Sequence, residues 1–238
     1  MRDPCARHST AMVDAVEETI AVAVDNSRAM VERARERIEE LGSSGAVAVV
    51  QGDITALDVA AVFDAAGMHP TNGGFDVAAI LLGTAAHLIT DDDAIACLRG
   101  AAAAVAPGGI VVLELEHPFD IFDGSLLRAE GDAWDRDVDG AKVLVEWGRE
   151  GDFFDVERHV VERTVGFNVV DAETGAAVDG WPSIEETVTC RIFTAPEVAL
   201  LARLAGLELV ATYGDMNADV SLNADDAHNM VCVLKKPE

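Results

Sequence analysis

The sequence predicts an α/β fold in which a parallel sheet is wound on both sides by helices. Short apolar runs alternate with helical patterns, at spacings that fit right-handed crossover connections. These runs are apolar at nearly every position, as is typical of strands covered on both faces. An acid, Asp25, directly follows the first run, and the carboxyl ends of such strands are where open α/β sheets bind ligands. The chain is therefore expected to hold a ligand at that edge.

The composition fits a globular protein of one domain, residues 1–238. Half of the 238 residues are hydrophobic, but no apolar run approaches the roughly 18 residues of a membrane span. There are 43 acids and 17 bases, a formal net charge of −26, which repels nucleic-acid phosphates and anionic membranes. We expect an acidic, soluble, cytoplasmic protein without nucleic-acid or membrane partners. The excess of acids fits either a high-salt cell interior or a GC-rich genome.

The four cysteines are expected to be reduced thiols. Cys5, Cys97, Cys190 and Cys232 form no C-x-x-C pair and no Cys/His pair at metal-ligand spacing, so no metal site is predicted. Cys97 and Cys232 lie in apolar patterns, where a thiol behaves as a small hydrophobe.

The first half of the chain predicts regular alternation of strand and helix. Asn26 and Ser27 provide a helix cap, Thr90 begins a helix with three acids in its first turn, and a tight Pro-Gly-Gly turn at 107–109 precedes a strand. Strands are expected at residues 20–24, 46–50, 75–82 and 110–114, and helices at 11–18, 28–41, 58–66 and 90–105.

Beyond Pro118 the pattern changes to antiparallel strands. Period-two stretches at residues 142–147, 153–170 and 185–193, with a hairpin turn at 173–175, predict a β-rich insertion over residues 119–193. We expect it to cover the ligand edge and to select the substrate. A capping box at Thr194 and Glu197 then begins a helix over 197–205, and two strands, 207–213 and 229–234, close the fold.

Several motifs in this order resemble the class I S-adenosylmethionine-dependent methyltransferases of the small-molecule type. They cover nearly the whole chain from about residue 7 and are fairly specific together. The matching segments are Val24-Asp25-Asn26-Ser27 with Met30, Gln51-Gly52-Asp53-Ile54, Phe75-Asp76 through Gly83-Thr84 and His87-Leu88, Ala106-Pro107-Gly108-Gly109, Arg191-x-Phe193-Thr194, and Tyr213-Gly214-Asp215. The resemblance implies a doubly wound, Rossmann-like methyltransferase sheet and S-adenosylmethionine as cofactor.

The resemblance also implies roles for individual residues. Asp25 would bind the ribose hydroxyls with Asn26 nearby, while Met30 would pack near the adenine. Asp53, after Gly52, would contact the adenine amino group, and Ile54 would line its face. Leu82, Gly83 and Thr84 would lie beneath the methionine part of the cofactor. The catalytic candidates are His87, which would face the substrate, and His117, which comes after the carboxyl end of a strand. Asp25 as a helix cap, Asp53 as a turn residue, Met30 as core and a structural His87 are the competing interpretations.

The chain departs from the family pattern at one place. It has no glycine before Gly42, whereas the family's first strand leads into a glycine-rich loop that lets the backbone approach the cofactor. The segment Arg7-His8-Ser9 resembles the residues immediately after that loop, so we expect the first strand to be missing or degenerate. That strand would lie between the one ending at Asp25 and the one ending near Leu82.

These observations support two main hypotheses of function. The first is an enzyme that transfers a methyl group from S-adenosylmethionine to a small molecule. The second is a catalytically impaired methyltransferase-like domain, either a truncated product or a non-catalytic partner subunit. An NAD-dependent oxidoreductase shares the ribose-binding acid but lacks the later motifs. The sequence leaves open the methyl acceptor, whether Met1 is the true start, and whether the chain forms homo- or hetero-oligomers; the insertion's acids would suit an amine or another cation.

Overall fold

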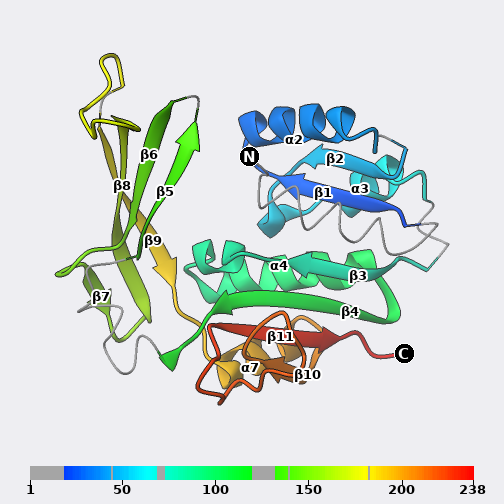
Figure 1. Cartoon of the computed structure of the whole chain (residues 1–238). Coiled ribbons are helices and arrows are strands. Elements are labelled where there is room, and N and C mark those ends of the chain that lie inside the picture. Colours follow the sequence, from blue (N-terminus) through cyan, green and yellow to red (C-terminus); the bar gives the residue numbers. More distant parts are fainter. Residues whose placement is uncertain (1–18, 44, 69–72, 120–131, 139, 182) are drawn as a thin grey trace.

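The computed structural model describes residues 19–43, 45–68, 73–119, 132–138, 140–181 and 183–238. The helix predicted at 11–18 lies outside these residues. The described elements form an α/β unit with a Rossmann-like arrangement and a separate antiparallel sheet beside it (Figure 1).

The strands of the α/β unit fall into two groups. In the first, β1 and β2 pair in parallel, with Asp25 opposite Gln51. In the second, the order is β10-β11-β4-β3, where β3 and β4 are parallel and the other neighbours antiparallel. The bounds are β1 Ala21–Asp25, β2 Val47–Gln51, β3 Phe75–Ile80, β4 Val105–Glu116, β10 Glu208–Tyr213 and β11 Asn229–Lys235.

A discontinuity separates these two groups. Within the described ranges, β1 pairs only with β2, and β3 pairs only with β4, so no ladder joins β1 to β3. This is the position at which the sequence predicts a missing or degenerate strand. The two groups are connected instead through packing of η1 Ile54–Ala56 and α3 Val59–Ala65 against α4 Asp91–Ala104.

The helix caps are those that the sequence predicts, although α7 begins at Ala195 and not at residue 197. Ser27 is the N-cap of α2 Arg28–Glu40, and Thr90 caps α4 by accepting a 3.1 Å hydrogen bond from the backbone N–H of Asp93. Thr194 begins α7 Ala195–Leu204 through the predicted capping box with Glu197. These polar caps satisfy backbone groups that a helix end leaves without partners.

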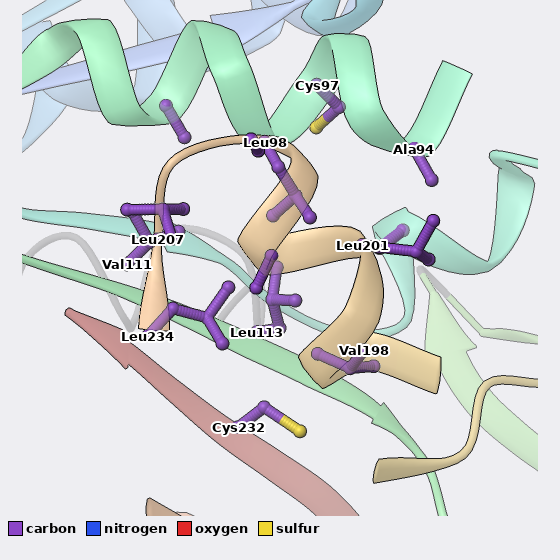
Figure 2. Close-up of a cluster of buried hydrophobic side chains, with 14 of the residues drawn as sticks. Ala94, Cys97, Leu98, Val111, Leu113, Val198, Leu201, Leu207, Cys232 and Leu234 are labelled. Atoms are coloured by element: carbon purple, nitrogen blue, oxygen red, sulfur yellow. The ribbon is translucent and has the colours of Figure 1, made fainter. Parts of the chain in front are cut away.

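The main core lies between the strands β4 and β11 and the helices α4 and α7 (Figure 2). Val111, Leu234 and Ala202 have no exposed surface, and Leu113 and Leu201 are also buried. A cavity of about 20 Å³ remains among these apolar side chains. It has room for about one water and offers no polar partner, so it is a packing defect and not a ligand site.

The antiparallel sheet is built by β5 to β9. Its bounds are β5 Asp132–Val138, β6 Ala141–Trp147, β7 Phe153–Asp155, β8 Val160–Asp171 and β9 Ile184–Arg191. The single strand predicted at 153–170 is two strands. Asp155 Oδ1 accepts from the N–H groups of Glu157 and Arg158, and His159 has φ 54°, so a turn interrupts the pairing.

Candidate functional site

The carboxyl ends of the parallel strands point toward the antiparallel sheet (Figure 1). β1 and β2 run in the same direction, as do β3 and β4, and the loops after them face β5 to β9. Ligands of open α/β sheets bind outside this edge. The predicted site residues belong to the ends of these strands and to the segments that directly follow them.

Asp25 ends β1 and organises the turn into α2. Its Oδ1 accepts from the backbone N–H of Ser27 at 2.7 Å, while Ser27 Oγ accepts from Met30 at 3.4 Å. The helix cap is therefore Ser27. Oδ2 of Asp25 accepts no hydrogen bond from the described part of the chain, which leaves one carboxylate oxygen for a ligand. Asn26 is exposed, and so is the apolar side chain of Met30, at 47%.

The turn after β2 lies beside Asp25. The N–H of Gly52 donates to the backbone carbonyl of Asp25 at 3.0 Å, and a Cβ on Gly52 would meet Val24 at 3.1 Å. Asp53 is exposed and caps η1, of which half-buried Ile54 is the first residue. Asp53 Oδ1 accepts from Oγ1 of Thr55 at 2.7 Å and from its N–H at 2.8 Å. These hydrogen bonds lower the pKa of Asp53 and keep it ionised.

The turn after β3 has an unusual backbone. Leu82 has φ 55° and Gly83 has φ 71°, and the Leu82 side chain is 55% exposed. Left-handed conformation in a non-glycine residue costs energy and is concentrated at functional sites. Thr84 then begins η3, which spans Thr84–His87, and its Oγ1 donates to the carbonyl of Leu81 at 2.8 Å.

Glu114 supports this turn and was not among the predicted site residues. Its Oε2 accepts from the N–H of Leu82 at 2.9 Å, and its Oε1 accepts from Nδ2 of Asn229 at 2.9 Å. The residue is only 7% exposed. The sequence contains a pattern that could have identified Glu114, an acid inside the apolar strand 110–115. Acids are almost never fully buried unless they are paired, so an acid at such a position points to a specific interaction.

The two catalytic candidates have different surroundings. His87 is exposed on η3. His117 accepts from the N–H of Phe119 through Nδ1 at 3.3 Å, so its proton resides on Nε2, which lies 2.9 Å from the carbonyl of Leu222. Both ring nitrogens of His117 are therefore in use. His117 links the end of β4 to the loop before β11. His87, in contrast, is exposed to solvent.

An ion pair attaches the antiparallel sheet to the end of β4. Arg163, on β8, donates two hydrogen bonds of 2.6 Å to the carboxylate of Glu116 and lies 5.6 Å from the ring centre of Trp147. Arg163 is 2% exposed. Beside this pair, Ala86 of η3 packs against Val161, Cys190 and Ile192. The insertion thus packs directly against η3.

Arg191 connects three further elements. From the end of β9 it donates to Asp91 of α4 at 2.6 Å and to Glu197 of α7, and it lies 4.7 Å from the ring centre of Phe193. In the described residues, Arg191 of the motif Arg191-x-Phe193-Thr194 therefore has a structural role, because it links β9 to α4 and α7.

Metal and membrane features are not found in the described residues. No group of three or more His, Cys, Asp or Glu side chains there could hold a metal ion. None of the helices described there is long and apolar enough to cross a membrane.

Comparison with known sequences finds a match in the first part of the chain. Residues 5–109 match the family model described as a methyltransferase domain. Over these residues the chain is similar to methyltransferases. A curated relative, the carboxy-S-adenosyl-L-methionine synthase of Photobacterium profundum, is 32% identical over 99 residues. That match covers 42% of this chain and about a third of the relative, 34%.

Solved structures extend the similarity to the whole fold of this chain. The CcbJ methyltransferase of Streptomyces caelestis has a TM-score of 0.66 at 18% identity, covering 99% of this chain and 91% of the other. An S-adenosylmethionine-bound amino pentose methyltransferase of Micromonospora echinaspora, CalS10, has a TM-score of 0.58 at 17% identity, covering 97% and 89%. The chain therefore shares the fold of these methyltransferases.

Proposed function

We propose that this chain transfers a methyl group from S-adenosylmethionine to a small-molecule acceptor. The observation that carries the proposal is the free carboxylate oxygen of Asp25, which lies at the strand edge in a segment matching a methyltransferase domain. The exposed, strained Leu82–Gly83 turn ends at the same edge and supports it further.

The residues around this edge fit the parts of the cofactor. In the proposal, Asp25 accepts from the ribose hydroxyls beside Asn26, and Met30 packs near the adenine. Gly52 allows close approach, Asp53 accepts from the adenine amino group through Oδ2, and Ile54 covers the ring. Leu82, Gly83 and Thr84 support the methionine part. The apolar side chains of Met30 and Leu82 are exposed, as a site that covers its ligand with apolar surface requires.

The cofactor supplies an electrophilic methyl group, and the protein orients the acceptor for in-line attack. Such positioning provides much of the rate enhancement in group transfer. His87 is the proposed base: its exposed imidazole takes the proton that the acceptor loses. We do not assign that role to His117, whose ring nitrogens are both engaged.

An amine is the acceptor class to test first. The net charge of −26 favours a cationic substrate over an anionic one, and CalS10 is named as an amino pentose methyltransferase. An amine must be neutral to attack, which gives the proposed base a function.

The second candidate is a methyltransferase-like domain without turnover. It is favoured by the discontinuity between β1 and β3. The described residues form no ladder that joins the two halves of the site, and loosely positioned halves would slow the transfer. Such a domain would act as a partner subunit or survive as a fragment.

Isothermal titration with S-adenosylmethionine tests the proposal. We expect saturable binding by the wild-type chain and roughly 10- to 100-fold weaker binding by Asp25→Asn, because hydrogen bonds to a charged group contribute about 1.5–3 kcal/mol. The control is Asp58→Asn, the same substitution at the N-cap of α3, where Asn caps equally well.

Turnover then separates the two candidates. Formation of S-adenosylhomocysteine with a panel of amines, reduced by His87→Gln, supports the enzyme. Binding without turnover on the panel supports the non-catalytic domain. No binding by the folded chain, or equal affinity in Asp25→Asn, contradicts the proposed cofactor site.

A further inference from the structure

Glu114 is the exception among the buried charged residues. The structure buries three charged side chains among the residues it describes: Glu114, Arg163 and Arg191. Arg163 is paired with Glu116, and Arg191 with Asp91 and Glu197. Within the same residues, Glu114 lies within 4.0 Å of no basic nitrogen.

Glu114 accepts hydrogen bonds from neutral donors only. One oxygen accepts from a backbone N–H, that of Leu82, and the other from the side-chain amide of Asn229. A carboxylate, which accepts at both oxygens and donates at neither, fits these two partners. Neither partner carries a positive charge.

A buried charge without a counter-charge is costly. The cost is offset when a cation binds nearby, because attraction between charges is strong in a poorly hydrated site. Glu114 is bonded directly to Leu82, the exposed left-handed residue of the turn after β3. Its charge therefore lies immediately behind the surface that this turn presents to the ligand edge.

We propose that Glu114 is the counter-charge for a cationic ligand, the sulfonium of S-adenosylmethionine, bound at the Leu82–Gly83 turn. This inference rests on the proposed function. Glu114 acts through the turn and through space, so it is a positioning and electrostatic residue and not a catalytic one. It favours the charged cofactor over the product, S-adenosylhomocysteine, whose sulfur is neutral.

The cofactor and its product provide a matched pair of ligands. They differ by a methyl group and by the charge on sulfur. The contribution of the methyl group cancels when the ratio of their dissociation constants is compared between the wild-type chain and a variant at position 114. Glu114→Gln preserves shape: Oε1 still accepts from Leu82, and the Asn229 amide can turn its oxygen toward the new amide group. Glu208→Gln is the control, since it removes one exposed acid whose partner, Lys235, pairs with Ile110 at the opposite end of β4.

Titration of both ligands into the full chain tests the inference. In Glu114→Gln we expect the Kd for S-adenosylmethionine to rise about tenfold relative to that for S-adenosylhomocysteine, and Glu208→Gln to keep the wild-type ratio. The double variant Glu114→Gln with Asn229→Asp returns a carboxylate to the same hydrogen-bonded pair. On a logarithmic scale, the double variant should recover at least half of the change in the ratio of the two dissociation constants. If the single variant does not fold, the double variant is compared with the wild-type chain instead.

The contrary results are distinct. If Glu114→Gln weakens the binding of both ligands equally, Glu114 only holds the turn. If the substitution changes only the KM of an amine acceptor, the cation that Glu114 attracts is the acceptor and not the sulfonium. Either overturns this inference while leaving the proposed function intact. Failure of the wild-type chain to bind either ligand overturns the proposed function and removes the basis of the inference with it.

Discussion

Three buried thiols illustrate how a single residue responds to its surroundings. Burial raises the pKa of Cys97 and of Cys190 to about 11 and that of Cys232 to about 12. Cys232 lies against β4, as Figure 2 shows, and none of the three has an exposed surface above a few per cent. They remain protonated and unreactive at neutral pH.

These thiols predict a loss of stability at alkaline pH. Their pKa values are higher in the folded chain than in the unfolded one. Their contribution to the free energy of unfolding is therefore complete below pH about 9 and is lost as pH rises through about 11. Urea unfolding at pH about 8 and about 10.5 measures this loss. The alkaline loss should be smaller in Cys97→Ala than in the wild-type chain; an equal loss would assign it to other groups.

The candidate site residues differ in how far the sequence reveals their surroundings. The turn at Asp25 is predictable because a buried strand, an acid and a helix cap occur in order. The surroundings of His117 are not, because the carbonyl beside its ring belongs to Leu222, a residue 105 positions away. Glu114 could have been singled out as an acid in an apolar strand. That no basic side chain of the described residues pairs with it depends on the packing of β3 and β11.

At the level of elements, one buried ion pair fixes the insertion to the sheet. Arg163 on β8 is almost completely buried, and both of its hydrogen bonds to Glu116 are short. Removing one member of a buried pair leaves the other charge without a partner, at a cost of about 3–5 kcal/mol. Replacing both members by apolar residues avoids that cost.

A single and a double substitution check this attachment. We expect Glu116→Ala to lower the free energy of unfolding by about 3 kcal/mol, and Glu116→Leu with Arg163→Met to lower it by less. The pair Arg149 and Glu146 is the control, because the arginine side chain is 40% exposed there and only 3% exposed in Arg163. Glu146→Ala should cost less than about 1 kcal/mol. Equal costs at the two pairs would contradict a special contribution from burial.

The elements of the insertion were harder to predict than those of the α/β unit. Alternation identified β6, β9 and most of β8, but β5 is rich in acids and gave no apolar pattern. Its place depends on pairing with β6. The division between β7 and β8 depends on a turn that Asp155 stabilises locally, inside a stretch whose composition favours continuous strand.

For the whole molecule, the order of elements and the doubly wound architecture were predictable, because buried strands and capped helices leave regular patterns. The proximity of Asp91, Arg191 and Glu197 was not, because it joins segments about a hundred residues apart. The discontinuity between β1 and β3 lies where the sequence predicts a missing or degenerate strand, and residues 1–18 lie outside the described part of the chain.

That discontinuity has a consequence for local opening of the native state. Strand β1 is half-buried along its whole length, whereas β4 and β11 contribute fully buried residues to the main core. Regions with few buried contacts exchange their amide hydrogens by partial unfolding, at a lower free energy than the core. In hydrogen exchange followed by mass spectrometry, peptides from β1, β2 and α2 should therefore exchange sooner than those from β4 and β11. S-adenosylmethionine should slow the first group most, and uniform protection would mean that the two groups open as one unit.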